Sequence, residues 1–526
     1  MNRSKDRFTL KERSWILYDW ANSVYATNIM AAIFPPIFVS IAGDAGDMWW
    51  SYGTGFATLI IALLAPLLGA VADYKGMKKK LFSVFVGLGI VFTALIAFTN
   101  DWRVMLVCYV LSRIGFSGSN LFYDSFLTDV TTNERMDKVS SWGYAMGYIG
   151  GSTIPFIISI GVLLWQGFDS VLAQKFAVLI TSVWWLVFTI PFMKNVEQEH
   201  YLDGDRPTIG AAFANIGRTA KDIMSEKGMF LFVIAYFFYI DGVGTIINIS
   251  TAYGTALGLG AMGMIIALLI TQIVAMPCSI LFAKMAKKIS TRKALLFAIS
   301  VYMLICLVGF YMGFTLEPHQ DKYNNAFDSY KQQAAGNLGL TFEGQEEADK
   351  AIDAYLMKSR DLMRDENTES LNNLALSWNN MTEGDKALAL QAQTLLSESN
   401  AGFIAGNREA ADNFRSAIKF SSTLFWAMAV LVGTVQGGIQ ATSRSYFGKL
   451  IPKKRSNEYF GFFDIFGKFA SVVGPFLYAF ISGLTGRSSL GTLCLLILFL
   501  VGFIILWRAK EPLEELERSR AALQDN

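Results

Sequence analysis

The chain has 526 residues and is poor in charge, since Asp, Glu, Lys and Arg make up only 17% of it. Soluble globular proteins carry about 25%. Histidine and cysteine are also scarce, with two and four residues. The cysteines, Cys108, Cys278, Cys306 and Cys494, lie in apolar segments without the spacing of metal ligands, so we expect them to be small buried hydrophobes. This scarcity argues against a catalytic metal or a Cys–His nucleophile.

Nucleotide-driven chemistry is not indicated either, because the phosphate-binding pattern G-x-x-x-x-G-K-[ST] is absent. We therefore expect no cofactor, no metal, no nucleic-acid partner and no enzymatic activity.

Apolar residues, by contrast, make up 53% of the chain, with 41 Phe and 45 Gly. A helix that crosses a bilayer needs about 20 mostly apolar residues. Twelve segments meet this requirement: 15–42, 51–72, 80–99, 103–127, 139–164, 173–193, 229–254, 260–283, 293–315, 419–446, 459–484 and 488–507. The first follows a basic N-terminus and is longer than the apolar part of a signal peptide, which has about 7–15 residues.

Lysine and arginine gather in alternate loops, for example at Lys75, Lys78, Lys79 and Lys80 after the second span. Basic residues in short loops mark the cytoplasmic side of a membrane. The pattern predicts that both termini face the cytoplasm.

Residues 316–418 interrupt the apolar pattern with 17 acidic and 9 basic residues. Runs rich in Ala, Leu, Glu, Gln and Lys predict two or three amphipathic helices there, on the outer side of the membrane. This insertion is either a solvated spacer or a part that contacts a solute or an unknown partner.

Two internal repeats divide the chain. Residues 69–79 align without gaps with residues 283–293, at an offset of 214. Arg135, Gly147 and Pro155 align with a similar set near the eleventh span, Arg455, Gly467 and Pro475, at an offset of 320. The offset grows by about the length of 316–418, as it should if the insertion interrupts the second of two six-span halves.

The predicted fold is therefore an all-α membrane protein with twelve transmembrane helices in two six-helix halves and a helical insertion between helices 9 and 10. The expected parts are 1–198 for the first bundle, 199–227 for a cytoplasmic central loop, 228–315 with 419–510 for the second bundle, 316–418 for the insertion and 511–526 for a cytoplasmic tail.

The loop after the second span resembles the signature of the major facilitator superfamily, through Gly69, Asp73, Gly76, Lys78 and Lys79. The resemblance implies a cytoplasmic gate, in which the acid binds cationic groups and a helix N-terminus of the other half. The residue after Asp73 is tyrosine where the family usually has arginine. The alternative is an ordinary basic loop.

Four further segments resemble the vacuole-effluxer-like branch of that superfamily, which includes a fungal autophagy-related vacuolar amino-acid effluxer and bacterial members. They are Trp15–Thr27, Phe122–Leu127, Tyr239–Thr245 and Gln436–Phe447. This resemblance implies a transporter of amino acids or small peptides. It also implies a bacterial inner membrane, or a vacuolar membrane in a eukaryote.

Polar side chains within the spans are candidate solute or ion sites, because they are costly in lipid. The alternative role is hydrogen bonding or ion pairing between helices. Asp464 and Lys468 lie four residues apart, so they are expected to pair. The candidates are Asp19, Asn22, Tyr25, Arg113, Asp124, Tyr239, Asp241, Asn248, Gln436, Gln440, Arg444, Asp464 and Lys468.

Together these features predict a secondary transporter that moves a small organic solute through the bilayer by alternating access, with Asp19 and Asp241 as acids that could couple transport to protons. Two alternatives stay open: a membrane receptor or scaffold that acts through 316–418, and a sugar or lipid transporter on the same fold.

Overall fold

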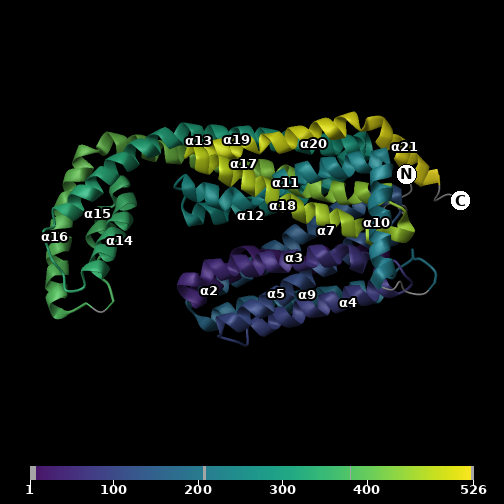
Figure 1. The fold of residues 1–526 in the computed structure, drawn as a ribbon, viewed down its shortest axis with the longest axis horizontal. Helices are drawn as coiled ribbons and strands as arrows, with labels where there is room; N and C mark the ends of the chain where they lie inside the picture. Colours follow the sequence, from purple (N-terminus) through teal and green to yellow (C-terminus); the bar gives the residue numbers. More distant parts are fainter. Residues whose placement is uncertain (1–6, 205–208, 380, 523–526) are drawn as a thin grey trace.

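The computed structural model describes residues 7–204, 209–379 and 381–522, and almost all of them are helical (Figure 1). Over these ranges, β-structure is limited to one isolated bridge between Tyr74 and Leu202. Eleven helices are long and apolar enough to cross a membrane, or twelve if one bent pair counts as a single span. The predicted all-α membrane fold is confirmed.

The first half is an all-helical bundle whose first span is broken. Pro35 and Pro36 lack a backbone N–H, and the chain bends by 40° where they begin α2. The predicted single span 15–42 is therefore two helices. The elements of this half are α1 (Leu10–Val24), η1 (Tyr25–Ala32), α2 (Phe34–Ala42), α3 (Gly46–Ala72), α4 (Met77–Ile96), α5 (Trp102–Ser125), α6 (Leu127–Val130), α7 (Asn133–Met146), η3 (Gly147–Thr153), α8 (Ile154–Gln166) and α9 (Val171–Asn195).

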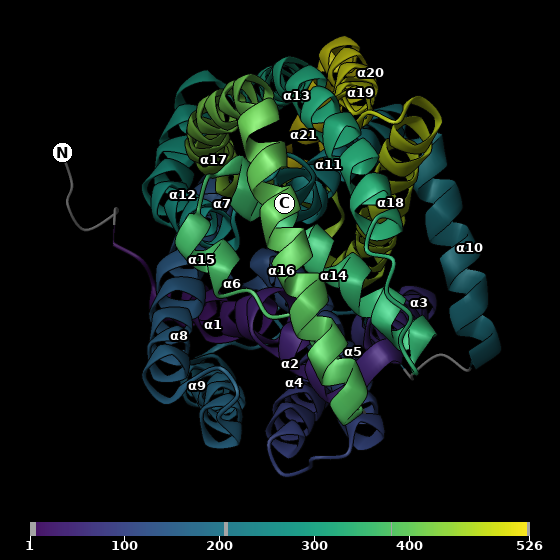
Figure 2. The same ribbon diagram turned by 90° about the vertical axis from the view of Figure 1, so that its left-hand side faces the viewer.

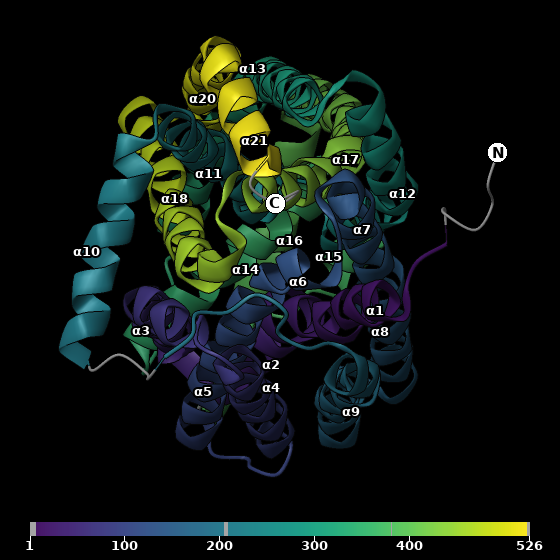
Figure 3. The ribbon, with the colours of Figure 1, turned by 90° about the vertical axis from the view of Figure 1, so that its right-hand side faces the viewer.

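The second half follows α10 (Ile209–Ser225), a helix that packs against α3, α11 and α18 (Figure 3). Its elements are α11 (Lys227–Ala256), α12 (Ala261–Ile289), α13 (Thr291–Gly336), α17 (Arg408–Leu450), α18 (Ser456–Thr485), α19 (Ser488–Cys494), α20 (Leu496–Arg508) and α21 (Lys510–Ala522). The two halves meet where α3 packs on α18 and where α7 packs on α12 and α17.

The bundle has two distinct ends. Both ends of the described chain, with α21, lie at one end, called here the terminal face (Figure 1). The insertion projects from the opposite end, the insertion face. The loop between α3 and α4 also lies at the terminal face, where the carbonyl of Asp73 accepts a hydrogen bond from Leu202 N. The end of α17 lies there too, because Arg520 of α21 donates to the carbonyl of Leu450.

The insertion continues the membrane helices. α13 runs without a break to Gly336 and α17 begins at Arg408, so the limits 315 and 419 mark a change in hydropathy but not a helix end. Between them lie α14 (Gln345–Arg364), α15 (Thr368–Asn372) and α16 (Glu383–Gly406). In Figure 2, α14 and α16 lie across the insertion face.

Glycines four residues apart in the fifth span, such as Gly147 and Gly151, allow close packing between helices of the first half. A Cβ at Gly147 would lie 2.6 Å from Ser23 Oγ of α1, and one at Gly151 would lie 2.5 Å from Ser23 Cβ. α1 can therefore lie directly on η3 and α7, which brings Asp19 next to the interface between the halves.

Candidate functional site

Arg444 of α17 connects the two halves inside the bundle. Its Nη1 donates to Asp124 Oδ1 of α5 at 2.8 Å, and its Nη2 donates to Asp19 Oδ2 of α1 at 3.2 Å. The arginine side chain is 4% exposed. Three residues predicted separately therefore form one ionic cluster around a buried arginine, with the cation from the second half and both acids from the first.

The remaining contacts of Arg444 hold its guanidinium in place. Nε donates to Ser140 Oγ at 3.0 Å, and Nη2 donates to the Ser140 carbonyl at 3.1 Å. The guanidinium also lies over the rings of Trp15 and Tyr144, at 4.7 and 4.5 Å from their centroids. Tyr123 Oη donates to Asp19 Oδ2 at 2.7 Å. A buried charge needs such compensation, because it has lost its hydration shell.

A cavity of about 300 Å³ lies beside this cluster, between the halves. Asp124 and Arg444 line it from one side, and the ion pair of Asp464 with Lys468, expected from their spacing, lines it from α18. It therefore presents two carboxylates and two cations to whatever occupies it. Its other polar lining comes from Tyr144, Tyr236 and Gln440.

Three other candidates bond between helices. Asn22 Nδ2 donates to Asn120 Oδ1, and the hydroxyls of Tyr25 and Ser112 lie 2.7 Å apart, as do those of Tyr239 and Ser443. These contacts match the structural alternative for such residues. Two more candidates lie outside the cavity lining: Gln436 is half-buried and Asn248 is exposed.

Arg113 of α5 differs from Arg444, because no carboxylate of the described residues lies within ion-pair distance of it. Its Nη1 donates to Tyr109 Oη at 3.1 Å and its Nη2 to Thr58 Oγ1 at 3.5 Å. Asp241 of α11 is fully buried, and neither of its carboxylate oxygens has a hydrogen-bond partner in the described structure.

At the terminal face, Asp73 binds the N-terminus of α18. Its Oδ1 accepts from the backbone N–H and the side-chain amide of Asn457, at 2.9 and 2.8 Å, and its Oδ2 accepts from Glu458 N at 3.0 Å. The unsatisfied N–H groups of a helix N-terminus favour such an anion. The contact joins a loop of the first half to a helix of the second, as the signature resemblance implies.

The glycines of the loop explain how Asp73 comes so close. A Cβ at Gly69 would lie 2.5 Å from the Asn457 carbonyl oxygen. Gly76 precedes α4 with φ of +71°, a left-handed conformation that glycine adopts readily and residues with a Cβ rarely adopt. Lys79 is half-buried, with no ion pair among the described residues.

Lys78 pairs with another acid of the first half, Asp129, and not with Asp73 of its own loop. Its Nζ lies 2.6 Å from Asp129 Oδ2, and both side chains are 0% exposed. The same Nζ donates to Ser456 Oγ of the second half at 3.0 Å. The reason is that α6 places Asp129 directly opposite the start of α4, while Asp73 turns toward α18.

A second contact between the halves at the terminal face centres on Asp137 of α7. Its carboxylate accepts from Lys449 Nζ at 2.6 Å, from Ser445 Oγ at 2.5 Å and from Thr291 Oγ1 at 3.0 Å. Sequence reasoning missed Asp137, Lys449 and Asp129. The repeat offset of 320 could have found them, because it aligns Asp129 with Lys449 and Asp137 with Asn457.

The same offset aligns Asp124 with Arg444, so these two residues are repeat partners that also bind each other. In both repeats, the end of the fourth span of a half carries a charge, and the two copies have opposite signs. The ionic contacts between the halves therefore follow the internal symmetry of the chain.

This architecture is similar to solved transporters of the major facilitator superfamily. A bacterial homologue of the iron transporter ferroportin in an outward-facing state aligns with a TM-score of 0.56 at 10% identity, over 95% of this chain and 98% of the other. The transporter FucP in an outward conformation aligns with a TM-score of 0.53 at 12% identity, over 95% and 98% of the two chains. The fold defines the class: this is an integral membrane protein with the major facilitator fold.

The family of vacuole effluxer Atg22-like proteins matches residues 49–335 and 421–515, and the chain belongs to this family. An uncharacterized MFS-type transporter, YxiO of Bacillus subtilis, is 37% identical over 513 residues, 95% of each chain. Autophagy-related protein 22 of Cryptococcus neoformans is 22% identical over 78% of this chain and 59% of its own. The family match leaves out 336–420, and the similarity to YxiO extends across that stretch.

Proposed function

We propose that this protein is a secondary active transporter that moves amino acids or small peptides by alternating access. The observation that carries the proposal is the cavity between the halves, lined by Asp124 with Arg444 and by Asp464 with Lys468. An amino acid has an ammonium and a carboxylate group, and each can exchange partners with one of these ion pairs. A sugar or lipid tail offers no charge that would replace these partners.

The terminal face is closed by contacts between the two halves, and these contacts must break before a solute can pass on that side. There Asp73 and Asp137 each bind residues of the other half. With the basic loops on this face, both termini lie in the cytoplasm, of the inner membrane in a bacterium or around a vacuole in a eukaryote. The conformation described is then one in which the cytoplasmic side is closed, and opening requires both contacts to break.

Flux into proteoliposomes tests the solute class and the coupling together. With radiolabelled amino acids and dipeptides, we expect saturable uptake that a proton gradient stimulates, because the candidate coupling acids Asp19 and Asp241 lie within the spans. Protein-free liposomes are the control. If no labelled amino acid or dipeptide moves faster than in the control, the solute class is wrong; if flux ignores the gradient, the proton coupling is wrong.

Removing residues 337–407 and joining α13 to α17 with a short Gly-Ser linker is expected to leave this uptake largely unchanged. The reason is that α14, α15 and α16 contribute no residue to the cavity and lie outside the family match. Uptake is measured as above, with circular dichroism as the check on folding. A folded variant without uptake would show that the insertion belongs to the transport machinery, and loss of a binding partner alone would favour a receptor role.

A further inference from the structure

Asp241 lies about half-way along the 30-residue helix α11, far from either end of the bundle. Its side chain is 0% exposed. The hydroxyl of Thr245, one turn later on the same helix, is also without a hydrogen-bond partner among the described residues. Two adjacent polar side chains therefore lie unsatisfied at the centre of a membrane helix, which is rare in a native structure.

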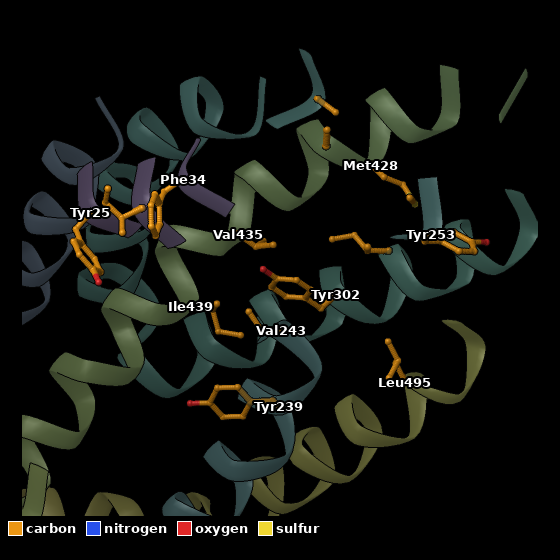
Figure 4. Close-up of a cluster of buried hydrophobic side chains, with 14 of the residues drawn as sticks. Tyr25, Phe34, Tyr239, Val243, Tyr253, Tyr302, Met428, Val435, Ile439 and Leu495 are labelled. Atoms are coloured by element: carbon orange, nitrogen blue, oxygen red, sulfur yellow. The ribbon is translucent and has the colours of Figure 1, made fainter. Parts of the chain in front are cut away.

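The surroundings of Asp241 combine apolar side chains with two polar groups, the Thr245 hydroxyl and the backbone N–H of Gly474. A Cβ at the adjacent Gly242 would lie 2.6 Å from the ring of Phe499 on α20, and Val243 is fully buried. In Figure 4, Val243 lies near Ile439 of α17, between the rings of Tyr239 and Tyr302. On the α18 side, a Cβ at Gly474 would overlap the Thr245 hydroxyl and lie 3.1 Å from Asp241 Oδ1. Only glycine lets α18 approach so closely.

The charged residues on the helices around α11 are engaged elsewhere. On α18, Asp464 and Lys468 pair with each other, and on α17, Arg444 pairs with Asp19 and Asp124. On α20, Arg508 is at the terminal end of the helix. α10 and α21 lie at the terminal face (Figure 1), and their charged residues are Arg218, Lys221, Asp222, Lys510, Glu511, Glu514, Glu515, Glu517, Arg518 and Arg520. The cations of α12, which are Lys284, Lys287 and Lys288, lie in its last two turns.

Asp19 and Asp124 show what an ionised acid needs in this bundle, because each has the guanidinium of Arg444 within 3.2 Å. Asp241 has no cation within ion-pair distance among the described residues, and an isolated carboxylate in a low-dielectric interior is neutralised rather than left charged. We propose that Asp241 is a carboxylic acid in this conformation and is the binding site of the coupling proton. Asp19, in contrast, stays ionised as a partner of Arg444.

The proton step is simple to balance. When α11 and α18 separate and water reaches the side chain, the carboxylic acid loses its proton to water and becomes a carboxylate. The Thr245 hydroxyl can then donate to that carboxylate, and return to the closed packing requires a proton from water to be taken up again. This role in coupling rests on the proposed function, whereas the protonation itself can be tested without a solute.

Infrared spectroscopy of the full-length protein in liposomes at neutral pH tests the protonation. We expect a carbonyl band of a protonated carboxylic acid that disappears in Asp241→Asn and persists in Asp124→Asn, since only the second acid has a cation partner. A second variant, Thr245→Val, keeps Asp241 and is expected to shift the frequency of the band without removing it. The test therefore does not depend on the folding of one variant. No band assignable to Asp241, or a band lost in Asp124→Asn instead, overturns the proposal.

Transport then separates this proposal from the solute class. In Asp241→Asn, exchange of labelled amino acid across liposomes without a pH gradient is expected to continue, while accumulation driven by the gradient is lost. A variant that still accumulates amino acid under the gradient contradicts the coupling role of Asp241. Failure of the unmodified protein to move amino acids would overturn the proposed function and leave the infrared result standing.

Discussion

Arg444→Met is expected to abolish transport and to destabilise the protein by about 3–5 kcal/mol, the cost of leaving a buried acid without its cation. That acid is Asp19, because the side chain of Asp124 is 31% exposed to the cavity. Two acids lose their partner at once, since both Asp19 and Asp124 bind Arg444. For a chain of this length that corresponds to a fall in Tm of about 3–5 °C. Thermal unfolding in detergent and uptake in liposomes measure the two effects.

Arg113→Met is the matched control, because Arg113 is also an arginine within the spans and has no carboxylate partner among the described residues. It is expected to change Tm much less. Arg444→Lys should fall between the two, since an ammonium group keeps the charge but cannot reach both acids and Ser140 in the planar geometry of a guanidinium. Equal losses of Tm in Arg444→Met and Arg113→Met would contradict the role given to the cluster.

Asp73→Asn is expected to shift the protein by at least about tenfold toward states with an open terminal face. The carboxylate accepts three hydrogen bonds from the N-terminus of α18, and an amide retains one acceptor oxygen. Hydrogen bonds to a charged group contribute about 1.5–3 kcal/mol each, and about 1.4 kcal/mol is a factor of ten.

Spin labels at the exposed positions Lys80 and Lys454, one on each half, would report the opening as longer distances in a cysteine-free background. Asp47→Asn is the control, because this exposed acid begins α3 at the other end of the same helix. An unchanged distance distribution in Asp73→Asn would mean that Asp137 and Lys78 keep the face closed without Asp73.

Sequence reasoning succeeded where a signal is local. Apolar runs of sufficient length identified the spans, and the change of offset between repeats located the insertion. It also proposed Asp73, Asp19, Asp124 and Arg444 as site residues. It missed the break at Pro35, since hydropathy continues across the prolines although the helix cannot.

The pairing of charges was beyond that reasoning, because each partner lies far away along the chain. Asp19 and Arg444 are 425 residues apart, and Asp73 and Asn457 are 384 apart. Lys78, named only as part of the gate motif, binds Asp129 from another helix. The repeat offset of 320 also aligns Asp129 with Lys449, two charged residues that the sequence analysis did not single out as site residues.

The sequence by itself determined that this is a membrane protein of two related helical halves with an inserted acidic segment, because long apolar runs and internal repeats can be read along the chain and a helix satisfies its own backbone hydrogen bonds in lipid. Only the tertiary structure decided which polar side chains meet. That depends on the rotation of each helix about its axis and on how closely the halves pack. These two features give Arg444 two acids and leave Asp241 without a cation among the described residues.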